Sequence, residues 1–503
     1  MDIDLIIVGV YLIAVLAIGV WSGRNIGTMR EFAVSNRGGL PVRALFATIV
    51  ATNVGGGNTI SLIEQVFTDG IVFPILRVME GLGLLFIAFF VAPRMKNYLG
   101  SAISPGGLAH LFFGRRGEVI AGVAGVFLTI GCVAGQVNMV GLLFHDFLGI
   151  SSVYGSLIGC GIFILYSAFG GIRAVAITDL IQLIIILVVL PIVAYLVISS
   201  VGGVDAVCAS IPENHMSLSR IADYPWKYGP LFLLFSMPLF EPVTIQRLLM
   251  GRDIGQLKKA FCWSGLTIAI AMVIITCIGL GAVALDAQIA PSSAMSNIID
   301  KVIPIGFKGI VVAALVAVFQ STADSYLNIG GIMLVCDIVS PCLKRSLTDL
   351  QMLKYARYAT FGLGLFAVLF ALTFEGMSPM NIIVSTDGFW FDIVLIPLLV
   401  SVMGYKGSIQ AFTWTAVVGS FTLMSWLIFG LEKRLGGVGG FFPTMIISLL
   451  MFFGVSEYGK RHGVFEREEQ ARQEKRKRIL RDMEKAHSQG EVYLKKDDWI
   501  PSK

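Results

Sequence analysis

Hydrophobic and polar positions alternate along this chain in long blocks, not in the short periods of a soluble protein. About thirteen apolar runs approach or exceed the roughly 20 residues that one membrane span needs. Their approximate limits are 4–23, 40–66, 71–93, 117–147, 152–170, 174–201, 228–250, 260–286, 303–339, 355–374, 379–403, 408–430 and 437–457. The pattern predicts an all-α integral membrane protein of about thirteen transmembrane helices in one domain (1–458), followed by a polar tail (459–503).

Composition and charge agree with this reading. Of the 503 residues, 56% are hydrophobic and 14% charged, and the mean hydropathy is +0.80, outside the range of soluble domains. With the N-terminus outside, thirty-one of the 38 Lys and Arg residues fall in inner loops and the tail, six fall outside, and Arg77 lies within a span. This bias predicts a multi-pass protein of the cell membrane with a cytoplasmic C-terminus. The net charge of +5 therefore reflects topology and indicates no nucleic-acid partner.

The second apolar run is interrupted by polar residues and three consecutive glycines, Gly55–Gly57, within the stretch Ala51–Ser61. Each glycine costs a helix about 1 kcal/mol against alanine. Hydrocarbon cannot satisfy an opened backbone, so such a break belongs inside protein. We expect a discontinuous helix whose freed carbonyls bind an ion and whose second half presents N–H groups to a solute.

A second interruption lies five spans later, where Pro238 and Pro242 flank Glu241. Each proline removes a backbone hydrogen bond and costs a helix about 3 kcal/mol. The spacing predicts two five-helix repeats, about 40–201 and 228–403, and an odd number of spans requires the second repeat to be inverted. Interrupted segments at matching positions of two halves are the best sequence indicator of a transporter's binding site.

The ninth run carries the hydroxyl pair Ser321 and Thr322. With Val318 they stand at i, i+3 and i+4 and share one helical face, where neutral oxygens would suit sodium. The alternative is ordinary hydrogen bonding of each hydroxyl to a carbonyl one turn earlier.

Three stretches together resemble the sodium:solute symporter family, which includes sodium-coupled proline, pantothenate, choline, sugar and iodide carriers. Gly170–Gln182 is similar to the family signature GG-x-x-A-V-x-x-T-D-x-x-Q, and Ser321–Ser325 resembles its S-T-A-D-S stretch. Ala51–Gly57 resembles the family's broken first core helix, and its triple glycine is closest to the choline-carrier version.

This resemblance implies a leucine-transporter-type fold of two inverted five-helix repeats plus peripheral helices. It also implies a sodium site between the broken helix and the eighth core helix. Carried over to this chain, its ligands are the carbonyls of Ala51, Val54 and Val318 and the hydroxyls of Ser321 and Thr322. Asp179 corresponds to an acid that the family associates with sodium coupling.

Two carboxylates keep alternative roles. Asp324 lies in mid-span, where a charge costs about 2.5–3.5 kcal/mol on insertion scales; it is either a second cation site or a hydrogen-bonded lock between helices. Asp179 is either part of an inner sodium exit or a cap at a helix N-terminus.

The candidate solute-binding residues are Asn53, Gly56, Asn58, Arg77, Glu80, Gln136 and Glu241. Arg77 and Glu80 either pair with each other, or Arg77 receives a solute carboxylate while Glu80 or Glu241 receives an amine. The amide side chains of Asn53, Gln136 and Asn138 either contact solute or form interhelical hydrogen bonds. The family's sugar carriers have polar sugar-contacting residues near Asn58 and Arg77, and the departure of this chain at both argues against a sugar.

We therefore predict sodium-driven symport of a small polar organic solute (amino acid, carboxylate or vitamin-like) into the cell by alternating access. Na⁺ is the co-transported ion, and we expect no organic cofactor and no catalytic residue. The alternatives are a proton-coupled carrier that uses Asp324 or Asp179, and a sodium-coupled carrier of a quaternary amine such as choline. The basic tail is either a solvated helix or a segment attracted to anionic lipid.

Overall fold

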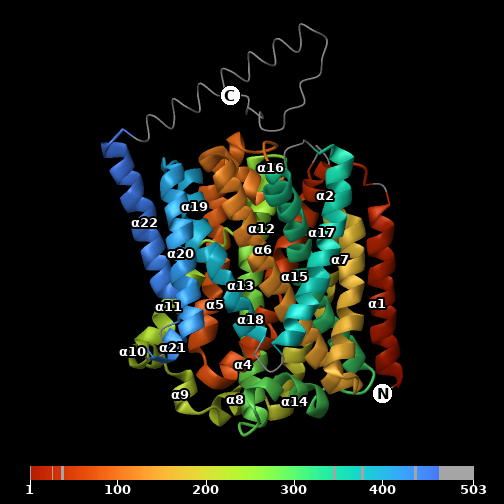
Figure 1. Cartoon of the computed structure of the whole chain (residues 1–503). Helices are drawn as coiled ribbons and strands as arrows, with labels where there is room; N and C mark the ends of the chain where they lie inside the picture. Colours follow the sequence, from red (N-terminus) through yellow and green to blue (C-terminus); the bar gives the residue numbers. More distant parts are fainter. Residues whose placement is uncertain are drawn as a thin grey trace.

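The structure is a computed structural model, and it describes residues 2–24, 26–35, 39–343, 347–374, 379–434 and 439–463. Within these residues every regular element is helical and no strand occurs, which confirms the predicted all-α class. Most of the predicted basic tail lies outside the described residues. The long helices stand side by side in one bundle (Figure 1).

The first part of the bundle contains α1 (Asp2–Gly23), α2 (Met29–Val34), α3 (Val42–Asn53), η1 (Gly56–Asn58), α4 (Ile60–Asp69), α5 (Val72–Phe86), η2 (Ile87–Val91), η3 (Ala92–Asn97), α6 (Pro105–Leu148) and α7 (Ser152–Val201). A run of shorter elements follows: α8 (Val204–Ser210), α9 (Glu213–Met216), α10 (Arg220–Asp223), α11 (Pro225–Ser236) and α12 (Pro242–Leu249).

The remaining elements are α13 (Ile254–Leu285), η4 (Pro291–Ser293), α14 (Ala294–Lys301), α15 (Phe307–Met333), η5 (Leu334–Val339), α16 (Ser340–Cys342), α17 (Asp349–Thr373), α18 (Pro379–Trp390), η6 (Phe391–Leu395), α19 (Ile396–Val402), α20 (Ile409–Phe429), α21 (Leu431–Arg434) and α22 (Phe441–Arg461). Of the η elements, η2, η5 and η6 are π-helical and the others are 3₁₀ turns.

Side chains that cap helix N-termini determine where several of the helices begin. Asp253 accepts a hydrogen bond from the Gln256 N–H at the start of α13, and Ser408 accepts one from the Ala411 N–H at the start of α20. Such side chains satisfy N–H groups that have no partner within the helix. They fix where the polar loops end and the membrane-crossing segments begin.

Ten helices in the described part of the chain are long and apolar enough to cross a membrane. One of them, α7, is divided at Gly171, which has a positive φ of 50°. Tyr166, before this point, and Thr178, after it, both reach the same carboxylate oxygen of Asp324. The two halves of α7 therefore run antiparallel. The interrupted segments α3–α4 and α11–α12 are too short to qualify singly, so the predicted count of about thirteen spans is not confirmed.

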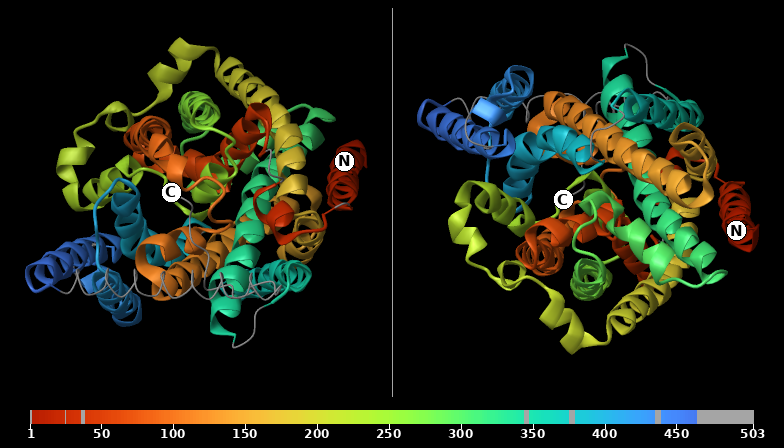
Figure 2. Two further views of the ribbon diagram at one scale, coloured as in Figure 1. Left: turned by 90° about the horizontal axis from the view of Figure 1, so that it is seen from above. Right: turned by 90° about the horizontal axis from the view of Figure 1, so that it is seen from below.

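The two ends of the chain differ in position. Figure 1 places the N-terminus, α8, α9 and α14 at one end of the bundle, whereas the last turn of α22 lies at the opposite end. The described chain therefore crosses the bundle an odd number of times. Viewed along the bundle, α1 stands at one side and α20 and α22 stand at the other (Figure 2).

Burial identifies the centre of the bundle. In the most apolar part of α15, 94% of the residues are buried, against 22% in α1 and α20 and 28% in α22. The last two long helices, α20 and α22, are thus peripheral. Because α15 contacts protein on all sides, polar side chains along it face other helices and not lipid.

The peripheral helix α1 is attached to α15 at two levels. Near the N-terminus, Asp4 Oδ1 accepts hydrogen bonds from the backbone N–H groups of Gly306 (3.0 Å) and Gly309 (2.6 Å), at the start of α15. This carboxylate caps the positive end of that helix. Two turns further along α1, the Tyr11 hydroxyl donates to Gln320 Oε1 at 3.0 Å.

Candidate functional site

The glycine-rich stretch forms a break between α3 and α4. Helix α3 ends at Asn53, and the backbone turns away at Val54 (φ −86°, ψ 51°). Gly55 is extended, and the single turn η1 precedes the start of α4. A Cβ on Gly55 would lie 2.1 Å from Thr322 Oγ1, and one on Gly56 would lie 2.1 Å from Met139 Sδ. These two glycines therefore allow the opened backbone to approach α15 and α6 closely.

The hydroxyl pair of α15 lies directly against this break. Ser321 Oγ is within hydrogen-bonding distance of Ala51 O (2.9 Å) and Val318 O (3.0 Å). Thr322 Oγ1 lies 2.9 Å from Thr52 O and 3.5 Å from Val318 O. Each hydroxyl thus contacts a carbonyl one turn earlier on α15, as the alternative interpretation expected. Each also lies within hydrogen-bonding distance of a carbonyl of α3.

Four of the five predicted sodium ligands, Ala51, Val318, Ser321 and Thr322, therefore converge in one buried cluster. The fifth, Val54, is buried and directly follows the last residue of α3. The Thr52 carbonyl also belongs to this cluster, although the residue spacing alone did not indicate it.

A second polar cluster lies on a neighbouring face of α15, about 60° round the helix from Ser321, against α7. Asp324 Oδ2 accepts hydrogen bonds from Tyr166 (2.6 Å) and Thr178 (3.5 Å), whereas Asp324 Oδ1 has no partner. Neither oxygen of Asp179 has a hydrogen-bond partner among the residues that the structure describes, and both carboxylates are completely buried. Buried polar atoms without a partner are rare in native proteins. Because Asp179 lies two turns beyond Gly171, it is too deep in its helix to cap an N-terminus.

Arg247 on α12 joins both interrupted helices to α15. Its Nη2 donates to Ser325 Oγ at 2.6 Å and to Thr52 Oγ1 at 3.2 Å, and its Nε donates to Thr48 Oγ1 at 3.3 Å. The side chain is 1% exposed and lies within electrostatic reach of Asp179 and Asp324. The sequence reasoning missed this role, although an arginine at the end of a span is an unusual buried residue.

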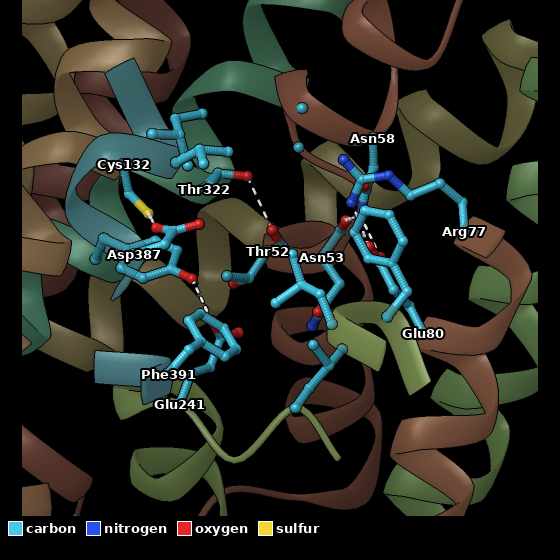
Figure 3. A pocket seen from close by; sticks show the side chains of 18 of the residues that line it. Thr52, Asn53, Asn58, Arg77, Glu80, Cys132, Glu241, Thr322, Asp387 and Phe391 are labelled. Carbon is cyan, nitrogen blue, oxygen red and sulfur yellow. Dashed lines mark hydrogen bonds and ion pairs between the residues drawn. The ribbon is translucent and has the colours of Figure 1, made fainter. Parts of the chain in front are cut away.

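A cavity of about 140 Å³ lies beside the break. It is lined by residues from α3, η1, α5, α6, α11, α15, α18 and η6, and by Glu241 between α11 and α12 (Figure 3). All but one of the predicted solute-binding residues reach it: Asn53, Asn58, Arg77, Glu80, Gln136 and Glu241. The exception is Gly56, whose N–H donates to Gln136 Oε1 at 3.2 Å. Asn138 lines a different cavity.

Arg77 and Glu80 form an ion pair with each other, as one of the two alternatives expected. Asn58 Nδ2 adds a hydrogen bond of 2.7 Å to Glu80 Oε2. The Arg77 guanidinium also lies over the Phe235 ring, 4.2 Å from its centroid, which is a cation–π distance.

On the other side of the cavity, Glu241 Oε2 accepts a hydrogen bond from Tyr326 at 2.6 Å. Near it, the hydrogen-bond partner of Asp387 on α18 within the described part of the chain is Cys132, whose Sγ lies 3.9 Å from Oδ1. Asp387, Cys132, Tyr326 and Phe235 were not among the predicted site residues. For Asp387 a signal existed, because a carboxylate within an apolar span is a functional candidate by default; the same span also carries Asp392.

Two interrupted helices that meet beside a central helix, with a polar cavity next to the break, define a secondary transporter of the leucine-transporter type. The same fold occurs in the solved structure of a Na⁺-coupled sialic acid symporter in a substrate-bound outward-open state. It superimposes with a TM-score of 0.74 at 20% sequence identity, covering 89% of this chain and 97% of that one.

Residues 36–419 match the family model of the sodium:solute symporter family, and the chain belongs to that family. The osmoregulated proline transporter OpuE of Bacillus subtilis is 26% identical over 92% of this chain and 96% of its own length. The sodium/glucose cotransporter of Vibrio parahaemolyticus is 23% identical over 75% of this chain and 76% of its own length. The family and these relatives are transporters, and the activity of this chain is sodium-driven symport of a solute.

Proposed function

We propose that Na⁺ binds where the end of α3 meets α15. Its ligands are the carbonyls of Ala51, Val54 and Val318 and the hydroxyls of Ser321 and Thr322. The observation that carries this proposal is that both hydroxyl oxygens lie 2.9 Å from carbonyl oxygens of the interrupted helix. A small cluster of neutral oxygens suits a hard cation of low charge.

The same contacts explain how sodium binding would act on the solute pocket. Each hydroxyl has one proton and two lone pairs, so it keeps one hydrogen bond to a carbonyl while a lone pair faces the ion. Bound Na⁺ then holds α3 against α15 and closes the Gly55–Gly57 break. Thr52, Gly55 and Thr322 also line the cavity. The closed break therefore completes one wall of the cavity. The carrier then opens the cavity to the other side of the membrane.

Asp179 and Asp324 belong, in this proposal, to sodium coupling and to the route by which the ion leaves. Together they have three buried oxygens without a partner, and a passing cation would compensate their charge. The rival reading is that these carboxylates carry protons and that the symporter is proton-coupled. Uptake that an imposed pH gradient drives in the absence of sodium would support that rival.

The transported solute is small, polar and organic, of the amino acid, carboxylate or vitamin-like kind. The energetics are sufficient for uptake into the cell. One charge that crosses 100 mV gains about 2.3 kcal/mol, and a tenfold sodium gradient adds about 1.4 kcal/mol. One ion per cycle therefore supports a solute ratio of several hundred at equilibrium.

The remaining parts of the proposal follow from the sequence. The transporter domain lies in a lipid bilayer, with its N-terminus outside the cell and its C-terminus in the cytoplasm. Repeat one spans about 40–201 and repeat two about 228–403, within a transporter domain of 1–458. The chain uses no organic cofactor, has no catalytic residue and binds no nucleic acid.

The sodium site is tested by removing both hydroxyls, as Ser321→Ala with Thr322→Ala, in the full chain reconstituted into proteoliposomes. Interactions with a charged group contribute about 1.5–3 kcal/mol each. We therefore expect the sodium concentration for half-maximal uptake to rise at least about tenfold.

Thr276→Ala is the matched control, because its hydroxyl donates to Met272 O one turn earlier on α13 and faces no break. An unchanged sodium requirement in the double variant, with normal membrane insertion, would remove these two ligands from the proposal.

A further inference from the structure

We propose that the solute is an organic ammonium ion with N–H donors, bound by the carboxylates of Glu241 and Asp387. This inference rests on the proposed function and names the chemical class of its solute. It selects the amine from the solute chemistries that remain open above, and it rejects a simple carboxylate.

The first observation is that the cavity holds more acid than base. Its charged lining residues are Arg77, Glu80, Glu241 and Asp387. Arg77 and Glu80 form an ion pair. In the described part of the chain Glu241 and Asp387 accept no hydrogen bond from a cationic side chain, although Arg247 and Arg77 lie within electrostatic range of Glu241 and Asp387 respectively. Figure 3 shows these two on the side of the cavity opposite the ion pair. A carboxylate removed from water is costly until a cation compensates it.

The second observation concerns the oxygens that remain available. Glu241 is 6% exposed, and only its Oε2 is used, as acceptor for Tyr326. Although Glu241 directly precedes α12, its side chain does not cap that helix. The one partner of Asp387 is the Cys132 thiol, a weak donor at 3.9 Å. One oxygen of each carboxylate therefore has no hydrogen bond from the described residues, and an ammonium group can donate to both.

The third observation argues against Arg77 as the receptor for a solute carboxylate. Its guanidinium is paired with Glu80 and packs over the rings of Phe235 and Phe73, 4.2 and 5.4 Å from their centroids. This pair uses Nη1 of Arg77, and an incoming carboxylate would compete with the buried Glu80 for the same guanidinium. Glu80 is 4% exposed and is further held by Asn58.

The same contacts favour an ammonium with N–H groups over a quaternary amine. A quaternary amine has no donor for Glu241 or Asp387 and is recognised by the faces of aromatic rings. Three aromatic rings line the cavity: Phe235, Tyr326 and Phe391. The Phe235 ring is occupied by Arg77 and Tyr326 directs its hydroxyl at Glu241, so the rings do not form an aromatic cage around one cation. The polar contacts of this cavity are therefore suited to hydrogen-bonded ammonium recognition.

The test uses the purified full chain in detergent with saturating sodium, and the readout is ligand-induced thermal stabilisation, titrated to an apparent Kd. The key probes are L-proline and L-prolinamide, which share a ring amine but differ in net charge. Putrescine, choline and lactate represent a dication, a quaternary amine and a simple carboxylate. We expect prolinamide or putrescine to bind at least about tenfold more tightly than proline, choline or lactate.

Glu241→Gln and Asp387→Asn should each weaken binding of the ammonium probe about tenfold or more, because charge-assisted hydrogen bonds are roughly twice as strong as neutral ones. Glu64→Gln is the control: this carboxylate lines the other cavity and should leave the ammonium Kd unchanged. Stabilisation by sodium alone, retained in both pocket variants, shows that they are folded.

Tighter binding of proline, choline or lactate than of either ammonium probe would overturn this inference, as would pocket variants that bind the ammonium probe normally. So would the absence of stabilisation by both ammonium probes at millimolar concentration. None of these results touches the sodium site, whose failure would appear separately as loss of the sodium-induced shift or of sodium-driven uptake.

Discussion

The contact between Gly55 and Thr322 allows a quantitative test of how the break is held. The Cβ of Gly55→Ala would lie 2.1 Å from Thr322 Oγ1 and 3.0 Å from its Cβ, whereas ordinary contact begins at 3.4 Å. Thr322 and the break must therefore separate by about 1.3 Å, the difference between 3.4 and 2.1 Å. A shift of that size would break the 2.9 Å contact between Thr322 Oγ1 and Thr52 O.

The expected cost follows from the overpacking of a close-packed site. Extra methylenes forced into such sites cost about 1–3 kcal/mol. If the substitution destabilises the sodium-bound conformation by this amount, sodium affinity should fall about five- to hundredfold. Gly55→Ala should change mainly the sodium concentration for half-maximal uptake, because residues that line the far side of the cavity are not displaced.

Gly57→Ala is the matched control, since a Cβ at that position meets nothing within 4 Å. Both variants lose the same backbone freedom and stand in the same glycine triplet. Sodium-induced stabilisation and sodium-activated uptake should therefore separate them. Adding Thr322→Ala to each variant completes a double-mutant cycle, in which only Gly55 should couple to Thr322. Equal sodium midpoints for Gly55→Ala and Gly57→Ala would refute this account of the break.

Two further substitutions test the polar contacts around α15. Arg247→Lys should lower the stability of the detergent-purified chain by about 1–3 kcal/mol, because one ammonium cannot reproduce the guanidinium's contacts with Thr52 and Ser325. Thermal unfolding measures this, with the exposed Arg252→Lys as control, and equal losses would argue against the contact network. Asp324→Asn should reduce sodium-driven uptake while leaving the Tyr166 contact in place, and full uptake in this variant would make Asp324 a structural residue only.

The sequence predicted the interrupted helices because glycine triplets and paired prolines have a large backbone cost that does not depend on tertiary context. It also predicted that Ser321 and Thr322 share a face, because helical periodicity fixes it. It could not predict that Thr52 supplies a carbonyl to Thr322, since that depends on how α3 turns away before the break. Similarly, Tyr166 and Thr178 converge on Asp324 only because α7 reverses at Gly171.

Less of the solute pocket could be predicted from the sequence. The pairing of Arg77 with Glu80 was one of two alternatives, since residues three apart on a helix can always meet. Asp387 and Glu241 stand 146 positions apart in the chain, and no periodicity relates α18 to the interruption before α12. The span count is not confirmed for a different reason. The two predicted runs 152–170 and 174–201 form the single element α7, and the interrupted segments are too short to qualify singly.

The attachment of α1 to α15 has a practical consequence. Although α1 is the first element of the chain and faces lipid along most of its length, Asp4 and Tyr11 anchor it to the central helix. Ile13, which is 69% exposed, lies on its outer surface, so a spectroscopic probe attached there would touch no residue of the cavity. Such a probe would report from the membrane side on the movement of α15, the helix that carries the proposed sodium site.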